Sequence, residues 1–227
     1  MPTASASMLD VLRRHHTLAI LAPHPDDEVL GCYGLIRQAQ ALGMSVQVHI
    51  ATDGERCFGL LSPEQEQSLR QHRRQESEEA SRRMGYAPPV FWGLGDTLLS
   101  QQTAALQGRL AQYWQADALW VTTWWDDGHP DHGATGQVLR DWGRQHGATT
   151  AYYPIWALMD AERTAGFMAH SVRSQVALTA AQHTEKKDIA KVFATQFRPH
   201  AFGQQIILAE PSLTMFTGEA EHYLYEN

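Results

Sequence analysis

The stretch Thr17-Leu-Ala-Ile-Leu-Ala-Pro-His-Pro-Asp-Asp-Glu-Val-Leu-Gly31 decides the fold of this chain. Residues 17–22 form an apolar run that ends at Pro23, as a buried parallel strand does when it meets a turn. A charged segment follows, and residues 29–42 then form an amphipathic segment that stops before Gly43, a typical residue after a helix end. Strand, loop and helix in this order predict the start of a βαβ unit.

The same alternation continues along the chain. Further strands are predicted at 45–51, 89–92 and 118–123, and helices at 29–42, 63–84, 103–115 and 132–145. Ser62 and Pro63 are a typical N-cap and first residue for the helix at 63–84, and Gly85 is a typical stop. Alternating strands and helices predict an α/β, Rossmann-like three-layer fold with a mostly parallel sheet and right-handed crossovers.

The two ends of the chain are less regular. Residues 1–8 are small and polar and predict a flexible N-terminal tail, which leaves residues 9–227 as a single domain. After residue 150 we expect a C-terminal elaboration of that domain. Its predicted elements are strands at 152–156 and 205–208, the latter at a sheet edge, and a helix at 182–197.

Composition excludes several classes of function. Of the 227 residues 43% are apolar and 19% charged, which suits a packed core and not a disordered chain. The 25 acidic and 18 basic residues give a net charge of −7, which argues against nucleic acid or an acidic membrane as partner. Two cysteines make no disulfide framework, and no apolar run reaches the ~20 residues of a membrane span, so we expect a cytoplasmic protein.

Two polar clusters follow predicted strands. The first, His24-Pro-Asp-Asp-Glu28, comes after the strand at 17–22, and the second, Asp126-Asp-Gly-His-Pro-Asp-His132, comes after the strand at 118–123. With a strand order of 3-2-1-4, both clusters would lie at the switch point where doubly wound sheets bind their ligands. Segments about a hundred residues apart would then face each other across one crevice.

The residue types in these clusters suit a divalent metal, because imidazole nitrogen and carboxylate oxygen are ordinary zinc ligands. Asp26 and Asp27 cannot easily both ligate one ion from a short turn, so one is expected to bind metal and the other to take a proton from water. His129 with Asp131 would supply an oriented imidazole for an oxyanion or a leaving group. The structural alternative is that the first cluster caps a helix and the second forms a solvated turn.

At these residues the sequence resembles the PIG-L or LmbE-like family of zinc-dependent N-acetylglucosaminyl deacetylases. Residues 22–28, Ala-Pro-His-Pro-Asp-Asp-Glu, match the first motif of that family, and 129–132, His-Pro-Asp-His, match the second. Shorter matches are Thr52-Asp-Gly-Glu55, Arg73-x-x-Glu76 followed by Gly85, and Gly93-Leu-Gly-Asp96. The resemblance covers roughly residues 17–200.

The resemblance implies a hydrolase that removes an N-acetyl group from an N-acetylglucosamine-type amino sugar or its conjugate, releasing acetate and a free amine. It implies one Zn²⁺ per chain, with His24, Asp27 and His132 as ligands. The implied partner is the small N-acetylated sugar. We expect no nucleic acid and no membrane, and a homo-oligomer stays open. Two other functions also stay open: a metal-dependent hydrolase of another bond, and a sugar-binding module that keeps the metal without turnover.

The resemblance also implies roles for the residues around the metal. Asp26 would be the general base, and His129, oriented by Asp131, would stabilise the oxyanion or act as the acid. Arg73 and Asp96 match sugar-binding positions.

Three further positions lie near these motifs. Trp125, from the pair Trp124-Trp125, is a candidate platform for the sugar, with burial in the core as the alternative. Asp127 stands where some relatives carry a tyrosine near the substrate carbonyl, and Gly95 replaces the usual proline before the sugar-binding aspartate.

Overall fold

The strands of the protein form one mixed sheet. We describe a computed structural model that covers residues 7–203 and 205–226. The strands within these ranges are β1 (Thr17–Ala22), β2 (Ser45–Thr52), β3 (Val90–Leu94), β4 (Ala118–Thr123), β5 (Thr150–Tyr153), β6 (Arg173–Ala177) and β7 (Ala220–Glu226). They lie in the order β3-β2-β1-β4-β5-β7-β6. The pairs from β3 to β5 are parallel, and β7 is antiparallel to both β5 and β6.

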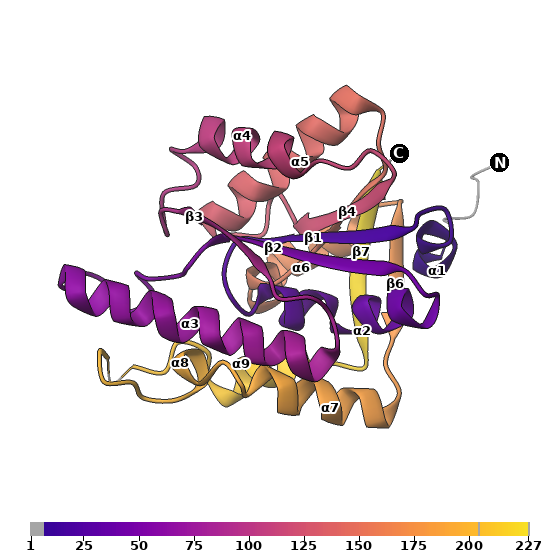
Figure 1. Ribbon diagram of the computed structural model, residues 1–227. Helices are drawn as coiled ribbons and strands as arrows, with labels where there is room; N and C mark the ends of the chain where they lie inside the picture. The colour runs from indigo at the N-terminus through magenta and orange to yellow at the C-terminus, as the bar shows by residue number, and fades with distance from the viewer. Residues whose placement is uncertain (1–6, 204, 227) are drawn as a thin grey trace.

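Helices cover both faces of this sheet, as Figure 1 shows. They are α1 (Met8–Leu12), α2 (Asp27–Ala41), α3 (Pro63–Met84), α4 (Thr103–Tyr113), α5 (Pro130–His146), α6 (Ala161–Ala169), α7 (Ala180–Ala190), α8 (Ala194–Phe197) and α9 (Glu210–Phe216), with a 3₁₀ helix at Trp156–Met159. In the view of Figure 1, α4 and α5 lie above the sheet, and α2, α3, α7, α8 and α9 lie below it. Of the described helices, none combines the length and apolarity that a membrane span needs.

The central position of β1 in the sheet explains why residues 18–22 are all apolar. Along β1, Leu18 and Ile20 belong to the core on one face, and Ala19 and Leu21 belong to the core on the other. A parallel strand between two helical layers is buried on both sides and therefore shows no polar alternation. The three-layer α/β fold is confirmed, as is the order 3-2-1-4 around the first strand.

Several C-terminal predictions were wrong. Residues 205–208 do not form an edge strand: the amide of Leu208 donates instead to the Gln196 carbonyl oxygen, 2.9 Å away. The edge is β6, and the last strand is β7. The helix predicted at 182–197 is interrupted by a turn at residues 191–193, which separates α7 from α8.

The N-terminal elements also differ from expectation. Residues 1–6 of the predicted tail lie outside the described residues, but Met8 begins α1 and is fully buried. The tail therefore does not extend to this methionine, whose apolar side chain joins the core next to α2. The helix predicted from residue 29 begins two residues earlier, at Asp27, so the polar cluster forms its first turn.

Gly136 allows α5 to approach β4 closely. A Cβ atom here would lie 2.6 Å from the Thr123 carbonyl oxygen and 2.6 Å from the Trp125 amide nitrogen. Since backbone cannot move aside as a flexible side chain can, Gly136→Ala is expected to lower the free energy of unfolding by about 1–3 kcal/mol, measured by urea denaturation. Gly108→Ala in α4 is the matched control, because its Cβ would meet nothing within 4 Å. It is expected to raise stability by about 0.5–1 kcal/mol, and equal effects of the two substitutions would contradict the close contact.

Candidate active site

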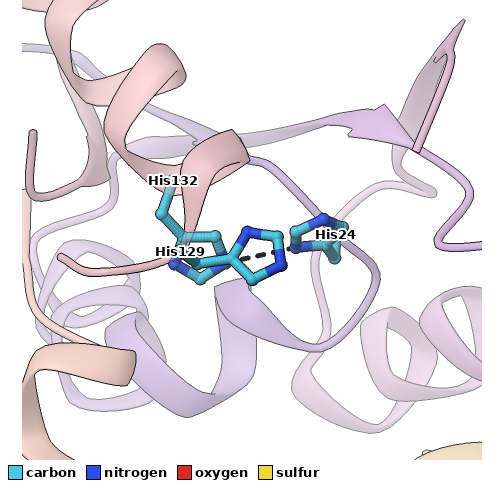
Figure 2. A group of neighbouring side chains, drawn as sticks. All are labelled: His24, His129 and His132. Carbon is cyan, nitrogen blue, oxygen red and sulfur yellow. Dashed lines mark hydrogen bonds between the residues drawn. The ribbon is translucent and has the colours of Figure 1, made fainter. Parts of the chain in front are cut away.

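The two polar clusters meet where β1 and β4 end side by side. The loop after β1 carries His24 and leads into α2, and the loop after β4 ends at His129, the N-cap of α5. In Figure 2 the rings of His24, His129 and His132 gather from these two segments, and the dashed line joins His24 to His132. The structure therefore brings residues from both predicted clusters to one point.

Three ligand atoms form a nearly equilateral triangle at this point. His24 Nδ1 lies 3.2 Å from His132 Nε2 and 3.3 Å from Asp27 Oδ2, and the last two atoms are 3.2 Å apart. Zinc bonds of 2.0–2.2 Å in tetrahedral geometry place their ligand atoms roughly 3.3 Å apart. The spacing of these three atoms therefore fits a tetrahedral metal whose fourth position is free.

The hydrogen bonds around the two imidazoles leave their lone pairs facing each other. His132 Nδ1 donates to Asp127 Oδ2 at 2.7 Å, so its Nε2 carries the lone pair. His24 Nε2 lies 3.2 Å from Asp96 Oδ1 and 3.3 Å from Asp131 Oδ2, which makes it the donor and leaves the lone pair on Nδ1. Two lone pairs and a carboxylate oxygen at 3.2–3.3 Å repel one another unless a cation lies between them. The donor set therefore fits a metal ion.

The charges of the site also call for a cation. His24 is buried, which disfavours its charged form, but hydrogen bonds to Asp131, Asp27 and Asp96 hold its pKa well above the usual value. Burial likewise opposes charge on His132, yet Asp27 and Asp127 raise its pKa to about 9. Both shifts come from the surplus of buried carboxylates, whose negative charge a bound divalent ion would balance.

Asp127 has a supporting position that the sequence did not reveal. Besides binding His132, its carboxylate accepts the amides of Ile155 at 2.7 Å, Trp156 at 3.0 Å and Ala157 at 3.1 Å. An acidic residue that holds the far nitrogen of a metal-binding histidine is a frequent arrangement. The only signal for this role in the sequence is the position of Asp127, five residues before His132.

The carboxylate of Asp131 does not orient His129 as expected. It lies against His24 and accepts the amides of Thr97 at 2.7 Å and Leu99 at 3.0 Å. The reason is its place at the start of α5, where the backbone amide of Asp131 donates to His129 Nδ1 at 3.2 Å while the side chain turns toward the loop at 97–99. The main chain of Asp131, and not its carboxylate, therefore orients His129.

Asp26 lies beside the triangle in an unusual backbone conformation. Its φ of 116° is a region that L residues rarely adopt, with Asp and Asn the most tolerant. Burial, reinforced by the neighbouring charge of Asp27, raises its pKa to about 7, although Arg73, 3.5 Å away, favours the charged form. A buried carboxyl group with a raised pKa is typical of a general base.

Arg73 and Asp96 reach the site but have contacts of their own. The guanidinium of Arg73 donates to the carbonyl oxygens of Pro25 at 2.6 Å and Gly54 at 3.0 Å, which ties the loops after β1 and β2 together. Asp96 accepts the amide of Arg56 at 2.8 Å and contacts His24. Both side chains also line the cavity that opens in front of the triangle of ligand atoms.

Glu76, in the same motif as Arg73, holds the C-terminal segment. Its carboxylate accepts the amide of Thr195 at 2.8 Å and the hydroxyl of Thr195 at 2.6 Å, at the start of α8. The next residue, Gln196, lines the cavity. Helix α3 therefore contacts both the loops after β1 and β2, through Arg73, and the segment that contains Gln196, through Glu76.

A cavity of about 350 Å³ opens in front of these groups. It combines the polar site with an apolar wall, and that wall consists of Leu30, Ile155, Trp156, Ile207 and Leu208. Trp156 stacks on His129 with ring centroids 5.8 Å apart. The sugar platform predicted at Trp125 was wrong, since that residue is not among the lining residues. Its ring packs under the Arg140 guanidinium, 3.7 Å away, on the α5 side of the sheet.

One protein-family model matches the chain. The model of the GlcNAc-PI de-N-acetylase family, PIG-L, matches residues 19–142, which is more than half of the 227-residue chain. That range includes the three ligand residues of the triangle together with Asp26, Asp127 and His129, and it does not include the cavity residues from Ile155 onward. No curated protein matches the chain.

Solved structures with this fold include several deacetylases. N,N'-diacetylchitobiose deacetylase from Pyrococcus horikoshii, complexed with its inhibitor, is 20% identical with a TM-score of 0.67, covering 96% of this chain and 88% of its own. The zinc-inhibited form of teicoplanin deacetylase Orf2 is 14% identical with a TM-score of 0.68, covering 92% and 97%. GalB, a 4-carboxy-2-hydroxymuconate hydratase from Pseudomonas putida KT2440, is 14% identical with a TM-score of 0.59, covering 92% and 95%. At these identities the likeness shows the fold alone, and one fold carries different chemistries.

Proposed function

The chain belongs to the PIG-L family of de-N-acetylases, and from this we propose that it is a metal-dependent hydrolase of N-acetylglucosamine-type sugars or their conjugates. The reaction adds water to the amide carbonyl carbon, breaks the C–N bond, and releases acetate and a free amine. The observation that carries the proposal is the triangle of His24, Asp27 and His132 with Asp26 beside it. A binding module needs no base next to its metal ligands, whereas a hydrolase does.

We assign the metal to His24, Asp27 and His132, with zinc as the ion that suits this donor set. A zinc ion there would supply Lewis-acid activation of water and of the scissile carbonyl group. Asp127 binds Nδ1 of His132, and Asp131 binds Nε2 of His24. These contacts leave Nε2 of His132 and Nδ1 of His24 facing the site.

Asp26 is assigned the proton transfers. Its carboxylate lies at the cavity wall, where it can accept a proton from the attacking water and then give that proton to the departing amine nitrogen. Arg73, 3.5 Å from Asp26 Oδ2, helps keep that carboxylate available in its charged form. The proton that Asp26 takes from water leaves with the amine, and the second proton of that water is released to solvent when the acetic acid product ionises to acetate.

His129 is assigned to the developing oxyanion. The Asp131 amide donates to its Nδ1, so the proton of a neutral ring is on Nε2. Burial, together with repulsion from His24 and His132, lowers the pKa of His129 to about 4, so the ring is neutral near pH 7. A neutral ring in the cavity wall can donate one N–H hydrogen bond to an oxyanion, which favours this role over that of a general acid.

A substrate panel tests the proposal. Zinc-loaded protein is incubated with N-acetylglucosamine, its methyl glycoside and N,N'-diacetylchitobiose, and free amine and acetate are both quantified. We expect the two products to form in equal amounts from at least one sugar, and p-nitrophenyl phosphate to stay intact. If no sugar yields free amine or acetate, the sugar-binding module is favoured. If p-nitrophenyl phosphate is hydrolysed, hydrolysis of another bond is favoured.

A further inference from the structure

Arg56 differs from the other arginines around the loop after β2. Arg74 holds Asp53 through two hydrogen bonds of 2.8 Å, and Arg70 donates to Glu55 at 2.6 Å. Arg73 is bound to two backbone carbonyl oxygens. Arg56 has only one ion pair in the described part of the chain, a 3.9 Å contact from its Nε to Glu66 Oε1. Its guanidinium is therefore the least satisfied of the four.

The position of Arg56 connects it to the active site. Its amide donates to Asp96 Oδ2 at 2.8 Å, and the other oxygen of Asp96 contacts His24. The side chain lines the same cavity as Asp26 and His129, and about a third of its surface is exposed. Arg56 thus lines the cavity that contains the candidate metal ligands, and its backbone contacts Asp96, which in turn contacts His24.

The Nε atom of Arg56 makes a 3.9 Å ion pair with Glu66 but no hydrogen bond within the described chain. This atom is buried from solvent and has no hydrogen-bond acceptor. A buried donor on a charged group costs free energy unless something accepts from it. Because the planar guanidinium matches the two oxygens of a carboxylate or phosphate, the missing partner is best supplied by a ligand anion.

The charge distribution of the cavity places that anion at Arg56. The cavity wall at the triangle of ligand atoms includes Asp26 and Asp27, which repel a second negative group even when a metal balances part of their charge. The cavity wall near Arg56 has no described carboxylate closer to the guanidinium than Glu66. A substrate with its amide at the metal and a negative substituent would therefore orient that substituent toward Arg56.

We propose that Arg56 selects substrates carrying an anionic group, phosphate or carboxylate, on the amino sugar or on the unit attached to it. This inference rests on the proposed deacetylation for the orientation of the substrate. It assigns Arg56 to substrate recognition and leaves the proton transfers to Asp26.

The experiment compares a neutral probe with anionic ones. The neutral probe is the methyl glycoside of N-acetylglucosamine, and the anionic ones are its 1-phosphate, its 6-phosphate and its carboxymethyl glycoside. Binding to the zinc-loaded protein is measured by calorimetry, and free amine is measured in parallel. Charge-assisted hydrogen bonds predict that at least one anionic probe binds about 10- to 100-fold more tightly than the neutral probe. The preferred probe identifies the anion and its position.

Substitutions that lower or raise the anionic-to-neutral affinity ratio test the role of Arg56. Arg56→Gln should reduce the anionic-to-neutral affinity ratio to near one, and Arg56→Lys should keep part of it because the charge stays while the planar fork is lost. Glu66→Gln removes the competing carboxylate and should raise the ratio a few-fold. Arg82→Gln is the charge-matched control, because Arg82 pairs with Glu79 at the exposed far end of α3. It should leave the ratio as in the wild type.

The outcomes separate this inference from the proposed function. A wild-type ratio near one for all three anionic probes, or a ratio that survives Arg56→Gln, would overturn the role of Arg56. Binding with the expected ratio but no amine from any probe would support Arg56 and contradict the deacetylase. If the neutral probe yields free amine and no anionic probe is preferred, the result would support the deacetylase and contradict the role of Arg56.

Discussion

Asp26→Asn is expected to lower kcat for deacetylation by about two to four orders of magnitude while one metal ion per chain stays bound. The expected loss is that of a general base, because Asn keeps the shape of Asp26 but cannot accept the proton of water. Asn is preferred to Ala here because a φ of 116° is better tolerated by Asn than by other residues with a Cβ. The measurement combines steady-state kinetics with metal analysis of the same samples.

Two comparisons make this result specific. Asp141→Asn is the matched control: Asp141 is exposed on α5, where it accepts a hydrogen bond from Gln137, and the change should leave kcat within twofold. The melting temperature of the Asp26→Asn protein should stay close to that of the wild type. Turnover within tenfold of the wild type would show that Asp26 is not the base, and loss of the metal would show that it is a ligand.

The parts of the fold that were predictable depend on local patterns. The strand at 17–22 was predictable because each of residues 18–22 faces one of the two cores, so the strand is apolar on both sides and shows no polar alternation. The helix at 63–84 was predicted with its observed bounds because Ser62 forms a capping box with Gln65 and Gly85 adopts a left-handed conformation. Because both polar clusters directly follow predicted strands, their meeting at one edge of the sheet could be predicted without any tertiary contact.

The parts that failed depend on tertiary contacts. Residues 206–208 are apolar, and Ile207 and Leu208 of this run line the cavity. A short apolar run of this kind cannot be distinguished from a strand by periodicity. Trp125 packs against Arg140 of α5, whereas Trp156 stacks on His129 and faces the site. Only these tertiary contacts distinguish the two tryptophans. The sequence likewise does not reveal that the carboxylate of Asp131 turns toward residues 97–99.

His132→Ala is expected to remove the metal and, with it, activity by about a thousandfold or more, since Lewis-acid stabilisation contributes several kcal/mol. The loss should not come from unfolding, because the Asp127 carboxylate keeps three backbone amide donors when the imidazole is gone. A chelator should lower the melting temperature of the wild type but not of His132→Ala, as bound metal stabilises only a protein that holds it. His146→Ala, at the exposed end of the same helix, is the control and should keep the metal.

A parallel variant decides between two possible ligand sets that share His132. Ligand atoms of His24, His129 and His132 also lie within 4.8 Å of one another, so three histidines are an alternative to the set with Asp27. The atoms of His24, Asp27 and His132 are only 3.2–3.3 Å apart, close to the spacing of tetrahedral ligands, and His129 Nδ1 already accepts the Asp131 amide. His129→Ala should therefore keep one metal ion per chain and lose kcat by about 10²–10³ through the missing oxyanion donor. Metal retained by Asp27→Ala but lost from His129→Ala would instead show that the three histidines are the ligands.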